Sequence, residues 1–120
     1  MNIFENYLSK INQTILENKK ILKISILENL ENINLEVPPS HFNYDLSSNV
    51  SLVLSKANNL NPTLLAEDIK RLLLNKINHF EKIEVAGPGF LNIKLSKDAL
   101  VENINEIIKN KDTYGSKKTN

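Results

Sequence analysis

The residue types that most often perform catalysis are scarce in this sequence or stand at unsuitable spacings. Cysteine is absent, which excludes a thiolate nucleophile, a disulfide and any zinc site built on cysteine. The two histidines, His41 and His79, lie far apart, and neither belongs to an H-x-x-x-H or H-x-E pattern. Because a histidine that binds metal or transfers protons needs an orienting partner, we predict no such site at either position.

The acidic residues and the glycines give no catalytic pattern either. Glu67 and Asp68, and likewise Glu102 and Glu106, fall on the polar faces of predicted helices, where solvated carboxylates are usual. The three glycines build neither G-x-x-x-x-G-K nor G-x-G-x-x-G, and no serine stands in G-x-S-x-G. We therefore predict no catalytic residue, no metal site and no cofactor in these 120 residues, and no enzyme activity of this chain alone.

One pattern remains, a tight turn that leads into a strand. The turn is Gly87-Pro88-Gly89, a sequence suited to a hairpin because glycine adopts the backbone angles that such turns need. Apolar side chains at 91, 93 and 95 then alternate with Phe90, Asn92 and Lys94. Since successive side chains of a strand leave opposite faces, the apolar set should face the core and the other three residues should share the outer face.

Phe90, Asn92 and Lys94 form a set that suits an unpaired RNA base. The ring offers a stacking surface, the amide can bond a base edge, and the ammonium can contact phosphate. An exposed phenylalanine beside a hairpin can equally pack under a loop or against a neighbouring domain. The spacing alone leaves both interpretations open, RNA binding and packing.

The composition is that of one globular domain with little net charge. A hydrophobic fraction of 41% and a charged fraction of 24% are ordinary for such a domain. Proteins that hold nucleic acid unaided usually carry a strong positive charge, whereas this chain has a net charge of +1, so any RNA contact should be weak in isolation. No apolar run approaches a membrane span and the first residues do not predict a secretion leader, so we expect a cytoplasmic location without membrane contact.

The periodicity of apolar residues predicts a two-layer α+β domain, with helices packed on one face of a small antiparallel sheet. Asn61 and Pro62 mark a helix start, and Ser96 should cap the last helix. Residues 21–31 fit either period and stay unassigned. Helices are predicted at about 3–19, 46–57, 61–77 and 96–108, and strands at 33–37, 82–85 and 90–95.

Three segments resemble, in order and spacing, the N-terminal additional domain of arginyl-tRNA synthetases. They are 35–39 (LEVPP) together with 44–50 (YDLSSNV), 62–68 (PTLLAED), and 85–93 (VAGPGFLNI), and the resemblance covers about residues 33–115. The Gly-Pro-Gly-Phe-Leu-Asn run is the most specific of these motifs. One departure is Tyr44, which stands where the family usually has glycine.

The resemblance implies a sheet of about four antiparallel strands that docks on the outer corner of tRNA, where the D-loop and T-loop meet. It also implies that Phe90 and Asn92 recognise a D-loop base. On this basis we expect residues 1–110 to be a single tRNA-recognition domain, and 111–120 to begin a linker to a catalytic domain absent from this sequence. The whole enzyme would be a monomer that uses ATP and Mg²⁺. The alternative is a protein-interaction or purely structural module.

Overall fold

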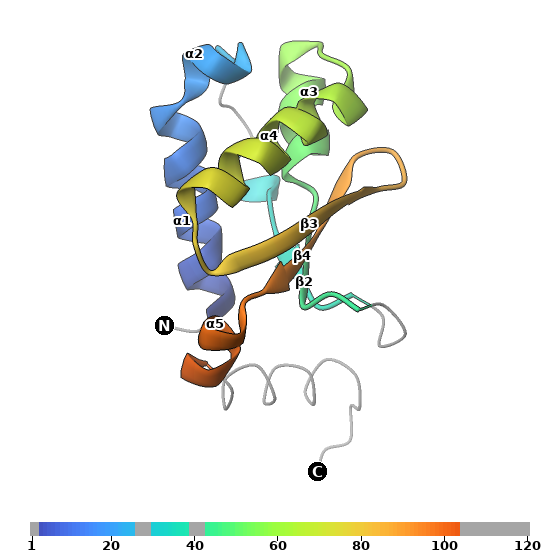
Figure 1. Cartoon of the computed structure of the whole chain (residues 1–120). Helices are drawn as coiled ribbons and strands as arrows, with labels where there is room; N and C mark the ends of the chain where they lie inside the picture. Colours follow the sequence, from blue (N-terminus) through green and yellow to red (C-terminus); the bar gives the residue numbers. More distant parts are fainter. Residues whose placement is uncertain (1–2, 26–29, 39–42, 104–120) are drawn as a thin grey trace.

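The computed structural model describes residues 3–25, 30–38 and 43–103 of the chain (Figure 1). The elements are α1 (Ile3–Glu17), α2 (Lys19–Leu22), the 3-10 helix η1 (Leu30–Asn32), β1 (Leu35–Glu36), β2 (Leu46–Ser48), α3 (Val50–Asn58), α4 (Pro62–Lys76), β3 (Phe80–Ala86), β4 (Phe90–Leu95) and α5 (Lys97–Glu102). None of the described helices combines the length and apolar character that crossing a membrane requires.

The four strands form one antiparallel sheet in the order β1-β2-β4-β3. β4 is therefore an inner strand, paired with β2 on one side and with β3 on the other. The register places Asn92 opposite Ser47 of β2 and opposite Glu84 of β3. The predicted two-layer α+β fold is confirmed, as is the four-stranded sheet that the resemblance implied.

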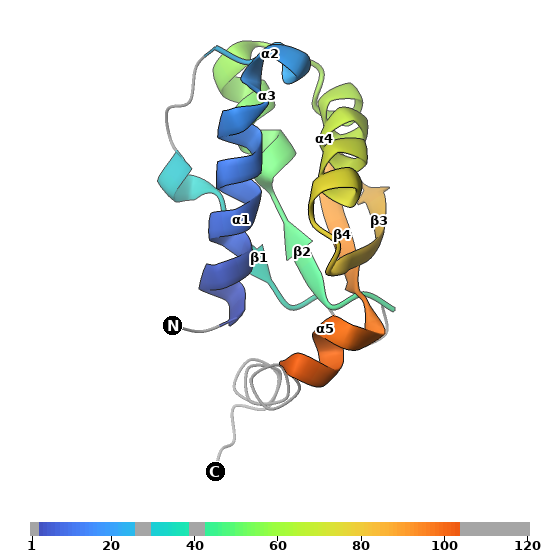
Figure 2. The ribbon, with the colours of Figure 1, turned by 60° about the vertical axis from the view of Figure 1, so that its left-hand side comes forward.

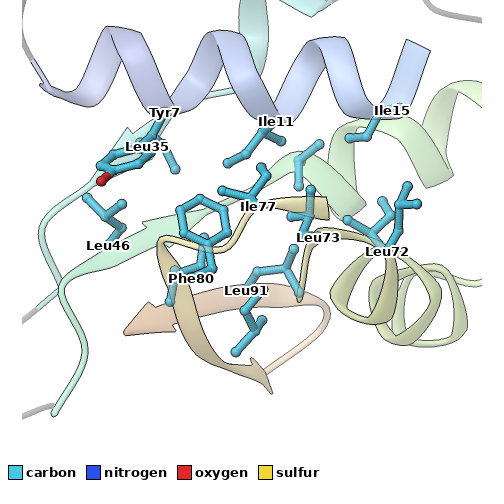
Figure 3. Close-up of a cluster of buried hydrophobic side chains, with 14 of the residues drawn as sticks. Tyr7, Ile11, Ile15, Leu35, Leu46, Leu72, Leu73, Ile77, Phe80 and Leu91 are labelled. Atoms are coloured by element: carbon cyan, nitrogen blue, oxygen red, sulfur yellow. The ribbon is translucent and has the colours of Figure 1, made fainter. Parts of the chain in front are cut away.

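Helices α1, α3 and α4 cover one face of this sheet (Figures 1 and 2). Tyr7, Ile11 and Ile15 of α1 point toward the strands, as Figure 3 shows. Each of these side chains is almost fully buried, which is the main source of folding free energy in such a layer. The inner face of β4 contributes Leu91, Ile93 and Leu95, all buried as the alternation predicted.

Local sequence explains where the best-defined helices begin and end. The side-chain oxygen of Asn61 accepts a hydrogen bond of 2.9 Å from the backbone N–H of Leu64, and Pro62 follows at the first helical position. Ser96 caps α5 in the same way, at 3.1 Å from the N–H of Ala99. Both predicted caps are confirmed, and α3 ends at Asn58 with Asn59 in the left-handed conformation.

The prediction of a helix from residue 46 was wrong. Residues Leu46–Ser48 are the strand β2, and the helix begins only at Val50. The three residues pair with β1 on one side and β4 on the other, and this pairing outweighs the helical spacing of Leu46 with the residues that follow. The strand predicted at 33–37 is shorter than expected, since only Leu35 and Glu36 pair.

The last predicted helix is described only as far as its first turns. Val101, expected on its apolar stripe, is exposed at 68%, while Leu100 packs against the core. The rest of that stripe and the basic tail lie outside the described residues, as does His41. Within the unassigned stretch 21–31, the described part holds the end of α2 and the first two residues of η1.

Candidate nucleic-acid interface

The turn between β3 and β4 fixes the first residue of the candidate site. Gly87 and Gly89 have φ values of +57° and +137°, in the region that side chains disfavour, and the N–H of Gly89 donates to the carbonyl of Ala86 at 3.2 Å. A Cβ on Gly89 would lie 3.2 Å from the carbonyl oxygen of Pro62 and 3.4 Å from Leu52. The hairpin therefore packs directly on the first residue of α4 and on α3, which holds the start of β4 in place.

The outer face of the sheet is organised in three cross-strand rows. At the hairpin end Phe90 stands opposite Ala86, and in the middle row Asn92 lies between Glu84 and Ser47, with Glu36 beyond Ser47. Lys94 stands opposite Lys82 in the third row, despite a bulge in β3 between residues 80 and 82. The predicted grouping of Phe90, Asn92 and Lys94 follows from this register, because the intervening residues are buried beneath the helices.

The three candidate residues differ in how far they reach the solvent. Phe90 is 39% exposed and Lys94 is half-buried, whereas Asn92 is only 6% exposed. Alternation along a strand gives the face but not the exposure. Asn92 is enclosed because it lies on an inner strand between four neighbours, namely Phe90 and Lys94 along the strand and Ser47 and Glu84 across it. Its side-chain amide nevertheless has no hydrogen-bond partner among the described residues, so its donor and acceptor groups are available.

Two further residues belong to this face, Tyr44 and Lys82. The ammonium of Lys82 lies 6.0 Å from the centre of the Tyr44 ring, within the range of a cation–π contact. The sequence placed Lys82 on this face without assigning it a role, and it marked Tyr44 only as a departure from the family motif. Periodicity could not have found Tyr44, because it precedes a strand that the sequence did not reveal.

Three further titratable residues, Tyr7, His79 and Glu102, contact one another. The Tyr7 hydroxyl and Nδ1 of His79 share a hydrogen bond of 2.7 Å, and Nε2 of His79 lies 3.5 Å from a carboxylate oxygen of Glu102. Burial, with a smaller contribution from the Glu102 charge, raises the pKa of Tyr7 to about 12. Asp68 forms an exposed ion pair with Arg71. The described part of the chain contains no group of three or more metal-ligating side chains that could hold an ion.

Comparison with known proteins assigns this architecture to a family. The helices on one sheet face and the polar outer face define an α+β domain, and the model of the arginyl-tRNA synthetase N-terminal domain matches residues 5–95. The chain belongs to this family. It is 39% identical to the arginine–tRNA ligase of Pelagibacter ubique over 115 residues and 34% identical to that of Staphylococcus epidermidis over 121 residues, matches that cover 96% of this chain in each case. With the ligase of Bartonella tribocorum the identity is 41% over 104 residues, 81% of this chain.

The chain spans about a fifth of the length of the curated relatives it matches, from 16% to 22% in these three. The match therefore concerns their N-terminal domain. The relatives are all named arginine–tRNA ligases, which is the same enzyme class as the arginyl-tRNA synthetase of the family model.

Proposed function

We propose that this domain binds the arginine tRNA at its outer corner and recognises one base of the D-loop. Phe90 stacks on the base, Asn92 bonds its edge, and Lys94 contacts phosphate. The observation that carries the proposal is the partly exposed ring of Phe90 beside the amide of Asn92, which has no partner among the described residues. The turn Gly87-Pro88-Gly89 supports the site by holding the start of β4.

The low exposure of Asn92 fits selection of a base better than general RNA binding. A base that reaches this amide has to lie close against the sheet between Phe90 and Lys94, where the protein displaces its water. An unpaired amide in such a place bonds strongly to a matching edge and penalises a base that leaves it unsatisfied. The ring, in contrast, accepts the face of any base.

The whole protein is proposed to be an arginine–tRNA ligase that uses ATP and Mg²⁺ and acts as a monomer in the cytoplasm. Residues 1–110 form its tRNA-recognition domain and 111–120 begin the linker to its catalytic domain. The domain performs no catalysis alone. The names of the relatives and the family model support the assignment of the whole protein as an arginine–tRNA ligase.

The test uses the full-length enzyme with arginine tRNAs that differ only at the D-loop base. Phe90→Ala should raise the KM for tRNA by about 5- to 150-fold, the range that corresponds to a stacking contact of ~1–3 kcal/mol. Asn92→Ala should relax the preference between the tRNAs, because an amide distinguishes base edges. Lys94→Ala should raise the KM for all the tRNAs by the same factor.

The matched control is Ile21→Ala, which removes a 70% exposed apolar side chain from α2, outside the sheet. It should leave KM and base preference unchanged. If Phe90→Ala and Asn92→Ala behave like this control in enzyme with an unchanged melting temperature, the face does not recognise tRNA. The protein-interaction alternative then takes its place.

A further inference from the structure

Lys82 and Lys94 present an arrangement that folding alone disfavours. They are direct partners across β3 and β4 on the outer face, and like charges in this position destabilise a sheet. Among the described residues, neither ammonium lies within ion-pair distance of a carboxylate. Neither charge is therefore taken up by an ion pair among the described residues. An external anion between the two lysines would relieve the repulsion.

Tyr44 holds one of these lysines in place from the far side of β4. It directly precedes Asp45, whose backbone N–H donates to the carbonyl of Ile93 at 2.9 Å and so begins the pairing of β2 with β4. Lys82 lies on β3, at the opposite edge of β4. The contact of 6.0 Å between the Lys82 ammonium and the Tyr44 ring thus reaches across β4 at the level of Lys94. The ring orients the ammonium without neutralising its charge, as a carboxylate would.

The middle row carries only acidic charge, whereas the lysine row carries two ammonium groups and one carboxylate, that of Asp45, which accepts a hydrogen bond from the backbone N–H of Leu95. The middle row carries Glu84 directly opposite Asn92, with Glu36 two strands away, and both are exposed. A phosphate is repelled from that row and attracted to the lysine row, which lies two residues further along β4, or roughly 7 Å. A single nucleotide covers such a separation between its base and a backbone phosphate.

We propose that Lys82 and Lys94 bind one backbone phosphate of the RNA whose base lies at Phe90 and Asn92, and that Tyr44 positions Lys82 for this contact. The inference rests on the proposed function and adds to it a phosphate subsite with two residues, Tyr44 and Lys82, that lie outside the Gly-Pro-Gly-Phe-Leu-Asn run. Glu84 and Glu36 limit the phosphate to the lysine row, so the subsite also sets the direction in which the nucleotide lies on the sheet.

The experiment measures Kd of the full-length enzyme for arginine tRNA between about 50 and 200 mM KCl. For one phosphate of single-stranded RNA, the double variant Lys82→Ala/Lys94→Ala should lower the slope of log Kd against log salt by ~0.7, and each single variant by part of that amount. The ratio of the double variant's Kd to the wild-type Kd should then shrink by about 2.5-fold over this range. Lys56→Ala, which removes an exposed lysine from α3 in the helical layer, is the matched control and should leave the slope unchanged.

Tyr44 is tested as a positioning residue. Tyr44→Leu should weaken tRNA binding, whereas Tyr44→Phe, which keeps the ring, should bind tRNA as the wild-type enzyme does. Without tRNA, Lys94→Ala should raise the melting temperature slightly, because it removes the repulsion. A lower melting temperature for the lysine variants, with an unchanged salt slope, would mean that the lysines contact another part of the protein and would overturn the proposal.

Failure of this inference can be distinguished from failure of the proposed function. If Asn92→Ala alters base preference but the two lysine variants match Lys56→Ala, the phosphate subsite is wrong and base recognition stands. If the lysine variants lower the salt slope but Phe90→Ala and Asn92→Ala have no effect, the face binds RNA phosphate without recognising a base.

Discussion

Replacement of Gly89 by alanine tests whether close packing of the hairpin on the helical layer determines the position of the site. The φ of +137° is almost exclusive to glycine, and a side chain there costs ~1–3 kcal/mol. The added Cβ would also lie 3.2 Å and 3.3 Å from the carbonyl oxygen and the Cβ of Pro62, and 3.4 Å from Leu52. Pro62 begins α4 and cannot move freely, so overpacking adds ~1–3 kcal/mol. We expect Gly89→Ala to lower the free energy of unfolding by about 3 kcal/mol.

Gly87→Ala is the matched control, two residues away in the same turn. Its φ of +57° costs a side chain ~1–2 kcal/mol, but its Cβ would meet only the edge of the Phe90 ring, at an ordinary distance of 4.0 Å. Urea unfolding of the 120-residue chain measures the loss of stability in both variants. With a slope of ~2 kcal/mol per M, the midpoint should fall by roughly 1.5 M for Gly89→Ala and by about half as much for Gly87→Ala. Equal losses for the two variants would refute the argument from close packing.

Two other substitutions test the packing of the core and the titration of Tyr7. Leu91→Ala removes a fully buried side chain from the inner face of β4 and should cost ~2–5 kcal/mol in urea unfolding, while the base preference of the folded enzyme stays unchanged. Because the pKa of Tyr7 is raised from 10.0 to about 12 in the folded state, its contribution to stability is complete below pH 10 and is lost as the pH rises through 12. Tyr7→Phe should abolish this step in a stability profile between pH 9 and 12; a profile that keeps the step would assign it to another group.

Much of the fold could be predicted because local chemistry and tertiary packing favour the same structure. The cap at Asn61, the proline after it and the hairpin glycines act over a few residues, and the structure confirms all of them. The strand β2 was missed for the opposite reason. Three residues are too few to show alternation, and the strand exists only because β1 and β4 pair with it from both sides.

The shared sheet face of the three candidate residues was predictable, but their surroundings were less so. Alternation put Phe90, Asn92 and Lys94 on one face, and the register agrees. It could not show that Asn92 would be nearly buried, because enclosure depends on which strands flank β4. Nor could alternation show the contact between Tyr44 and Lys82, because these two residues are 38 positions apart in the chain.

The opposite end of β4 is a second anchor of the candidate site, in addition to the packing of the hairpin. There the backbone N–H of Ser96 donates to the carbonyl of His79 at 2.8 Å, and the N–H of Leu95 donates to the carboxylate of Asp45 at 2.9 Å. Phe90 lies five residues from Leu95 along the strand, or about 17 Å, so a small rotation at this end would displace the ring. A rotation of only about 2° at Ser96 would move the ring by ~0.5 Å, the tolerance within which a binding group must be held. Under the proposed function, angular stiffness at the junction of β4 and α5 therefore adds to the packing of the hairpin in determining how accurately a base is selected.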